Sequence, residues 1–280
     1  MVKGTTKLLG IIGDPISHSL SPAMHNIAFE ATGMDCIYVP LPVRPKHLGE
    51  AVRGLCSLGF MGVNVTVPHK EKVLPFLDRV SDEAARIGSV NTIKIHDGRV
   101  LGDNTDWQGF LNHLAEIPFD PEGSEALILG SGGSARSVAY ALLSKGARVT
   151  LCGRSIETTA KVAEHFRKFF PATNPGAMTY DQLSLQRINA DMVINTTPLG
   201  MPPQFSSSPW PEKAMFPKCG LVYDLVYNPP ITPFIEQALK NGVRAVNGLG
   251  MLVHQAALAF NIWTGIPAPL EAMRRAVTLC

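Results

Sequence analysis

The 280-residue sequence lacks the patterns that would place the chain in a membrane, in a disulfide-stabilised fold or on nucleic acid. No run of about 18 apolar residues occurs, so we expect no membrane-spanning helix. The five cysteines are odd in number and widely spaced, without a C-x-x-C pattern, which argues against a disulfide framework and a thiolate metal site. Charged residues make up 17% of the chain, the net charge is +2, and no basic run occurs. Nucleic-acid binding is therefore not expected as a main role.

Further absences narrow the chemistry. The eight histidines show no H-E-x-x-H or comparable ligand spacing, so we expect no metal site. No G-x-S-x-G turn occurs, which argues against a serine nucleophile. The first seven residues lead directly into a strand pattern and do not resemble a signal peptide. Because the cysteines look like core residues of a reducing compartment, we expect a soluble, cytoplasmic protein.

Short β-rich segments alternate with helical patterns, which predicts an α/β fold with two domains and a cleft between them. The polar, turn-rich residues 118–124 are a plausible joint. Proline and serine in residues 202–217 indicate a surface loop, and residues 249–280 look helical throughout. The predicted strands are 8–12, 37–40, 62–67, 126–129, 147–152, 192–195, 221–224 and 244–246, with a hairpin at 89–94 and 99–102. The predicted helices are 21–32, 45–58, 71–77, 81–87, 106–117 and 134–145.

The most informative motif is a G-x-G-x-x-A turn at residues 130–135, between a predicted strand and a predicted helix. Glycines let the backbone approach a pyrophosphate closely, and the N-terminus of the following helix attracts the anion. The alternative is a purely structural strand–turn–helix unit. The next strand ends in Gly153-Arg154-Ser155, where an NAD site would have an acidic residue. An arginine and a hydroxyl suit a 2′-phosphate, so the sequence favours NADP, although Glu157 lies nearby.

Three polar clusters follow predicted strands, at the edge where open α/β sheets bind ligands. They are residues 17–22 (Ser-His-Ser-Leu-Ser-Pro), 64–70 (Asn-Val-Thr-Val-Pro-His-Lys) and 102–107 (Gly-Asp-Asn-Thr-Asp-Trp). In the first cluster, Ser21 has the simple alternative of capping the next helix. In the second, Lys70 is predicted at a helix start, where a cation is poorly placed for a purely structural role. In the third, Asp103 or Asp106 is expected to cap the next helix.

Together these segments resemble the shikimate dehydrogenase family over essentially the whole chain. The resemblance implies that residues 1–105 and 249–280 form the substrate-binding domain and that residues 106–248 form a Rossmann-type, doubly wound NADP-binding domain. The segments that carry it are residues 19–22, 64–70, 88–92, 102–107, 130–136, 195–201, 223–229 and 248–255.

The resemblance also implies roles for individual residues. Lys70 and Asp106 would be catalytic, and Ser19 and Ser21 would bind the substrate carboxylate. The remaining substrate contacts would come from Thr66, Asn91, Tyr227 and Gln255. The cofactor would be bound by Asp82, Gly130, Ser131, Gly132, Gly133, Ser134, Gly153, Arg154, Ser155, Thr196, Thr197, Leu225 and Gly248. The family usually has Asn-Arg-Thr where this chain has Gly153-Arg154-Ser155.

The implied reaction is the reversible NADPH-dependent reduction of 3-dehydroshikimate to shikimate, in the chorismate route to aromatic amino acids. A lysine ammonium can donate a proton to the alkoxide that hydride transfer creates, and a carboxylate beside it would keep it charged and oriented. One alternative is a quinate/shikimate dehydrogenase with broader substrate or NAD use. Another is a dinucleotide sensor without catalysis, against which the presence of both Lys70 and Asp106 argues. The sequence leaves the oligomeric state open between monomer and homodimer.

Overall fold

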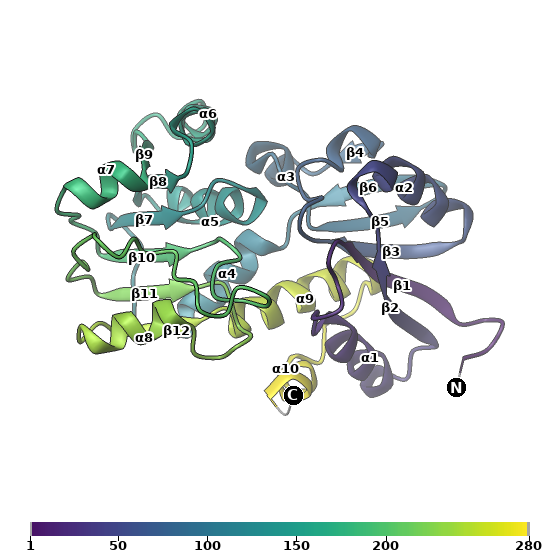
Figure 1. The fold of residues 1–280 in the computed structure, drawn as a ribbon. Coiled ribbons are helices and arrows are strands. Elements are labelled where there is room, and N and C mark those ends of the chain that lie inside the picture. Colours follow the sequence, from purple (N-terminus) through teal and green to yellow (C-terminus); the bar gives the residue numbers. More distant parts are fainter. Residues whose placement is uncertain (1, 279–280) are drawn as a thin grey trace. The chain divides into compact units, whose positions relative to one another are not determined.

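The computed structural model describes residues 2–278, which fall into two compact units. The first unit contains the described residues up to Gly109 and those from Leu252 onward, and the second contains Phe110–Met251. Two helices, α4 (Asp106–Ala115) and α9 (Leu249–Thr264), carry the chain from one unit to the other (Figure 1). Among residues 2–278, no helix combines the length and the hydropathy needed to span a bilayer.

The first unit is built on a mixed six-stranded sheet. Strand β1, next to the edge strand, is parallel to both of its neighbours, whereas β5 is antiparallel to β3 and to β6. Asp97 and Gly98 close the β5–β6 hairpin with positive φ angles of 50° and 71°, as their Asp-Gly sequence predicts. In spatial order the strands are β2 (Cys36–Pro42), β1 (Lys7–Gly13), β3 (Phe60–Val65), β5 (Thr92–His96), β6 (Arg99–Asp103) and β4 (Arg79–Val80).

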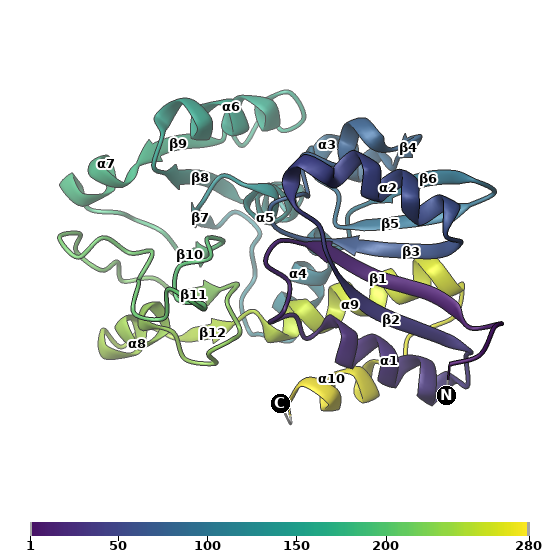
Figure 2. The same cartoon turned by 45° about the vertical axis from the view of Figure 1, so that its right-hand side comes forward.

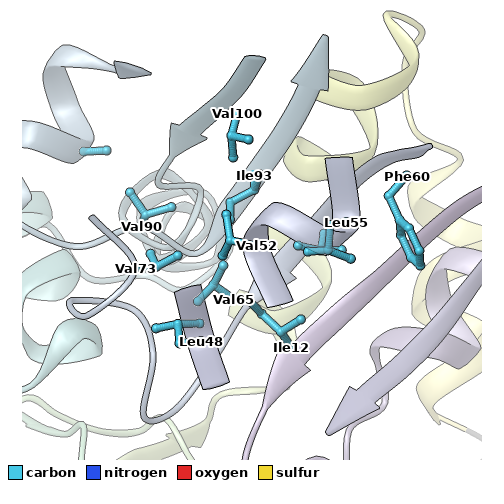
Figure 3. Close-up of a cluster of buried hydrophobic side chains, with 12 residues drawn as sticks. Ile12, Leu48, Val52, Leu55, Phe60, Val65, Val73, Val90, Ile93 and Val100 are labelled. Carbon is cyan, nitrogen blue, oxygen red and sulfur yellow. The ribbon is translucent and has the colours of Figure 1, made fainter. Parts of the chain in front are cut away.

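Helices cover both faces of this sheet. Helices α1 (Ser21–Thr32) and α10 (Leu270–Thr278) pack against each other on one side, and α2 (Leu48–Ser57) lies on the other (Figure 2). The α2 side chains Leu48, Val52 and Leu55 are buried against strand residues in one apolar cluster (Figure 3). Their i, i+4, i+7 spacing puts them on one face of the helix, which explains why α2 docks with that face inward. The strand residues of the cluster include Ile12, Val63, Val65, Ile93 and Val100.

The second unit has a fully parallel six-stranded sheet. The chain starts at β7, moves outward through β8 and β9, and then returns to the other side of β7 to form β10. Helix α5 (Gly133–Ser144) packs on β7 and β8, and α8 (Pro233–Lys240) packs on β11 and β12. This is a doubly wound, Rossmann-type sheet, which confirms the predicted α/β fold class. The strands in spatial order are β12 (Ala245–Asn247), β11 (Leu221–Asp224), β10 (Met192–Asn195), β7 (Glu125–Leu129), β8 (Arg148–Gly153) and β9 (Gly176–Thr179).

Several local predictions are wrong. Residues 71–77 form no α-helix: the chain makes turns and then a short 3-10 helix at Leu74–Phe76, so Lys70 does not stand at a helix start. The helical stretch 249–280 is broken at Gly265, whose φ of 75° ends α9, and two prolines precede α10. The loop 202–217 is not wholly at the surface, because Trp210 is buried and donates to the Ala214 carbonyl. Elements that the sequence analysis missed are β4, β9, α6 (Ile156–Arg167), α7 (Tyr180–Leu185) and α8.

The cysteines are core residues only in part. Cys152 is fully buried at the end of β8, and burial raises its pKa to about 12. Cys36, Cys56 and Cys219 are half-buried free thiols. Cys280 lies outside the described residues.

A buried histidine makes the first unit sensitive to acid. His25 on α1 is fully buried, with its ring stacked 4.4 Å from that of Tyr38 and 5.2 Å from that of Trp263. Among the described residues, neither ring nitrogen has a hydrogen-bond partner. Burial lowers the pKa of His25 from 6.5 to about 3, and the nearby Asn64 side chain has a smaller, opposing effect.

The sign of the pH effect follows from this lowered pKa. The unfolded chain takes up a proton on His25 below pH 6.5 while the folded chain does not, so stability is retained above pH 6.5 and lost as the pH falls toward 3. On going from pH 7 to pH 5, His25 should lower the free energy of unfolding by about 2 kcal/mol. We expect His25→Phe to remove that part of the acid sensitivity in urea unfolding at the two pH values. An unchanged difference between the two pH values in His25→Phe would contradict the assignment.

Candidate active site

A lysine from a loop and an aspartate from the start of a helix form a largely buried ion pair in the first unit. Lys70 lies in the turns after β3, and Asp106 is the first residue of α4, just beyond β6. The Lys70 Nζ atom donates to Asp106 Oδ2 at 2.7 Å, and the two side chains are 13% and 7% exposed. Because both side chains are largely shielded from water, the Asp106 carboxylate balances the charge of the Lys70 ammonium and fixes the orientation of its side chain. The structure thus brings together the two residues predicted to be catalytic.

Asn91 holds the other carboxylate oxygen of Asp106. Its Nδ2 atom donates to Asp106 Oδ1 at 2.9 Å, and lies 3.3 Å from Gln255 Oε1. Its Oδ1 atom accepts from the Thr105 amide at 2.7 Å. Gln255 reaches this position because α4 and α9 approach closely: a Cβ added at Gly109 would lie 2.8 Å from Gln255 Cβ. Four residues predicted for the substrate site, Lys70, Asn91, Asp106 and Gln255, are therefore linked by direct hydrogen bonds.

The start of α4 is capped by Asn104, not by either aspartate. The Asn104 Oδ1 atom accepts from the amides of Asp106 and Trp107 at 3.0 and 3.4 Å. The Asp103 carboxylate accepts from the Ser81 hydroxyl at 2.7 Å. The expectation that Asp103 or Asp106 caps this helix is therefore wrong. Because the amide oxygen of Asn104 takes this role, both carboxylate oxygens of Asp106 are left for side chains.

The two predicted carboxylate-binding serines lie at the start of α1. Ser21 is the first helical residue, one position after the N-cap residue Leu20, so the alternative in which Ser21 caps the helix is wrong. Ser19 instead supplies a capping oxygen, accepting from the Ser21 amide at 3.3 Å. Thr66, just after β3, packs its methyl group against Gly13 at the end of β1.

A line of four buried polar side chains lies behind these residues, and the sequence analysis predicted a role only for Asn91 among them. The Tyr38 hydroxyl donates to Asn64 Oδ1 at 2.6 Å, Asn64 Nδ2 donates to Thr92 Oγ1 at 3.2 Å, and Thr92 Oγ1 donates to Asn91 Oδ1 at 3.0 Å. All four residues are at most 4% exposed. Burial raises the pKa of Tyr38 well above its ordinary value, so the hydroxyl keeps its proton. This line connects Tyr38, through Asn91, to the Lys70–Asp106 pair. Its signal in the sequence is an asparagine flanked by valines in an otherwise apolar strand.

In the second unit, the glycine turn follows β7. At this strand the order of strand addition changes from one side of the sheet to the other. Gly130 has a φ of 124°, and a Cβ atom there would collide with Thr196 Oγ1. Gly132 is the N-cap residue of α5 and has no side chain to accept from the first-turn amides. A bound anion could therefore come close to the backbone of this turn and accept hydrogen bonds from the first amides of α5, as a pyrophosphate site requires. The predicted cofactor residues here are Gly130, Ser131, Gly132, Gly133 and Ser134.

The predicted 2′-phosphate residues follow β8. Gly153 ends the strand, and a Cβ added to it would lie 2.9 Å from the Thr159 methyl group. Arg154 is exposed, and Ser155 caps α6 by accepting from the Thr158 amide at 3.3 Å, which leaves its hydroxyl hydrogen free to donate elsewhere. Glu157, two residues further on, pairs with Lys161 at 2.6 Å, and that hydrogen bond lowers the pKa of Glu157. Its charge is thus partly balanced locally.

The remaining predicted cofactor residues follow β10, β11 and β12, except Asp82, which lies in the first unit. Thr196 donates to the Leu129 carbonyl at 2.7 Å, which places it beside the glycine turn. Gly248 lies against the Leu225 carbonyl, where a Cβ atom would collide. Tyr227, predicted to contact the substrate, lies in the second unit after β11. Asp82 lies in the first unit, as the exposed first residue of α3 (Asp82–Ile87).

Comparison with known proteins identifies the family that the whole chain resembles. Residues 11–93 match the family model of the shikimate dehydrogenase substrate binding domain, and residues 248–278 match that of the shikimate 5'-dehydrogenase C-terminal domain. The shikimate dehydrogenase (NADP(+)) of Carboxydothermus hydrogenoformans is 43% identical over 279 residues, 99% of each chain. A crystal structure of a shikimate dehydrogenase in complex with NADP+ has a TM-score of 0.91 at 36% identity, covering 99% of this chain and 96% of the other. The Thermus thermophilus enzyme, in complex with NADP(H) and shikimate, has a TM-score of 0.85 at 35% identity, covering 98% and 99%.

Proposed function

The chain belongs to the shikimate dehydrogenase family, and on that basis we propose that its first unit binds the substrate and its second unit the cofactor. Its reaction is the reversible NADPH-dependent reduction of 3-dehydroshikimate to shikimate, a step toward chorismate and the aromatic amino acids. The cofactor is NADP.

Ser19 and Ser21 bind the substrate carboxylate in this proposal. Both flank the first turn of α1, where the helix dipole favours an anion. The ring hydroxyls of the substrate are bound by Thr66, Asn91 and Gln255 from the first unit, with Tyr227 as a further contact.

Lys70 moves the proton. In the reducing direction its ammonium donates to the ketone oxygen as that oxygen becomes an alkoxide, and in the oxidising direction its amine takes the proton back. Asp106 keeps the ammonium aimed, and Asn91 fixes the carboxylate by binding its second oxygen at 2.9 Å. The 13% exposure of Lys70 leaves a route for proton exchange with solvent. When bound, NADPH supplies the hydride.

The second unit suits the cofactor chemically. The absence of a Cβ at Gly130 and Gly132 leaves a cradle at the N-terminus of α5 for the pyrophosphate. Arg154 binds the 2′-phosphate with Ser155 beside it, and Thr196, Thr197, Leu225 and Gly248 border the nicotinamide. Asp82, in the first unit, is proposed as a further cofactor contact.

The observation that carries this proposal is the buried Lys70–Asp106 pair in a chain that is 43% identical to a named relative over its whole length. Steady-state rates with shikimate and quinate, each with NADP+ and NAD+, test it. We expect the highest kcat/KM for shikimate with NADP+. Comparable values for quinate or for NAD+ would favour the broader quinate/shikimate dehydrogenase, and cofactor binding without turnover would favour a sensor.

We further propose a cytoplasmic location, where NADPH is available, and a monomeric or homodimeric state. Cell fractionation tests the first, and light scattering coupled to size-exclusion chromatography tests the second.

A further inference from the structure

A fully buried carboxylate stands at the carboxyl end of the second unit's sheet. Asp224 is the last residue of β11 and is not exposed at all. Its Oδ1 atom accepts from Asn195 Nδ2 at 2.8 Å and from the Val226 amide at 3.0 Å. Its Oδ2 atom accepts from the Thr232 hydroxyl at 2.6 Å. One side chain thus ties together the end of β10, the loop after β11 and the residue that precedes α8.

Asn195, which Asp224 holds, is in turn hydrogen-bonded to the loop after β10. Its Oδ1 atom accepts from both the amide and the hydroxyl of Thr197, at 2.9 and 2.7 Å. Its Nδ2 atom also reaches the Leu199 carbonyl at 3.3 Å. Because the Asn195 amide group is planar, the bond from Nδ2 to Asp224 fixes the direction in which Oδ1 faces Thr197.

Thr232 closes the arrangement from the other side. Its hydroxyl donates to Asp224 and accepts from the Ile235 amide at 3.2 Å, so it also caps α8. The far end of the β10 loop packs on it, since a Cβ added at Gly200 would lie 3.2 Å from Thr232 Cβ. The loops after β10 and β11 are therefore held as one body around Asp224.

Burying a carboxylate costs free energy unless it is well hydrogen-bonded. Burial raises the pKa of Asp224 to about 6, against the opposing effect of its hydrogen bonds to Thr232, Val226 and Asn195. At pH 7 and above the group is thus mainly ionised and can accept from all three donors at once. An asparagine side chain in the same place would have nearly the same shape. Its NH2 group would face the Thr232 hydroxyl, however, and could not accept the hydrogen bond that Asp224 Oδ2 accepts.

We propose that Asp224 is a positioning residue for the nicotinamide end of the cofactor site, acting through Asn195 on Thr196 and Thr197. The inference rests on the proposed function, which assigns those threonines to the nicotinamide. Thr196 is itself bonded to the Leu129 carbonyl beside the glycine turn, so the anchored loop continues directly into the predicted pyrophosphate site. Asp224 sets the distance and angle at which this loop meets the cofactor, without touching it.

Asp224→Asn is the direct test, with NADPH titrated against the full-length protein by fluorescence and shikimate titrated separately by calorimetry. We expect the Kd for NADPH to rise about tenfold, because the loop that carries Thr196 and Thr197 loses one charge-assisted hydrogen bond that holds it, while the Kd for shikimate stays within about twofold. The matched control is Asp191→Asn at the opposite end of β10, where an exposed carboxylate accepts from the Glu125 amide at 2.8 Å. That variant should bind both ligands normally.

A second pair of variants separates positioning from folding. Thr232→Ser keeps the hydroxyl and should retain wild-type KM for NADP+, whereas Thr232→Val removes it and should raise that KM while leaving the KM for shikimate unchanged. Equal losses for both ligands in Asp224→Asn, or no loss for either, would overturn the proposal, as would identical behaviour of the two Thr232 variants. A wild-type protein that does not bind NADPH would instead overturn the proposed function.

Discussion

Replacing Lys70 by alanine is expected to lower kcat by about 10²–10⁴-fold, the usual contribution of a positioned acid or base. The alkoxide would lose its proposed proton donor and the positive charge of the ammonium. The Kd for shikimate should change less, because the serines of α1 and the amides of Asn91 and Gln255 remain. Steady-state kinetics with NADP+ and shikimate, and calorimetric titration of shikimate, measure the two quantities. Lys72→Ala is the control, since Lys72 lies two residues away in the same loop and is exposed.

The partner of Lys70 provides the sharper test of the mechanism. Asp106→Ala should also be severe, because the lysine then loses its 2.7 Å partner and its orientation. If the two residues act as one unit, the double variant will be far less impaired than the product of the single losses implies. Independent, multiplicative losses would count against a joint role. A Lys70→Ala enzyme with near-normal kcat would remove the lysine from the mechanism.

Arg154→Ala is expected to weaken NADPH binding by about 10- to 150-fold while leaving NADH binding nearly unchanged. The range corresponds to the loss of one charge-assisted hydrogen bond of about 1.5–3 kcal/mol to the 2′-phosphate, a group that NADH lacks. Fluorescence titration with both cofactors gives the comparison.

Arg148, at the other end of the same strand, supplies the control for this substitution. It pairs with Glu125 at 3.0 Å, and Arg148→Ala should bind both cofactors as the wild type does. Equal weakening of NADPH and NADH by Arg154→Ala would show that the guanidinium does not contact the 2′-phosphate.

Features that arise from neighbouring residues were readable in the sequence. The glycine turn at 130–135 and the Asp97-Gly98 hairpin depend on the backbone preferences of a few consecutive residues. Arg154 was found by its place after the strand that follows this turn. The alternation of strands and helices, which identified the α/β class, is local in the same sense. Errors arose where the local signal was weak, as in residues 71–77, where turns and a 3-10 helix occur instead of an α-helix.

The tertiary structure alone decided how polar residues distant in the chain are paired. Asn91 and Gln255 are 164 residues apart and meet only because glycine lets α4 and α9 approach closely. The pairing of Lys70 with Asp106, and that of Asn195 with Asp224, likewise depend on which groups lie within about 3 Å of one another. A sequence shows that a polar residue must find a partner once it is buried. Which partner it finds is determined by the order of the strands and the packing of the helices, which bring distant loops to the same end of a sheet.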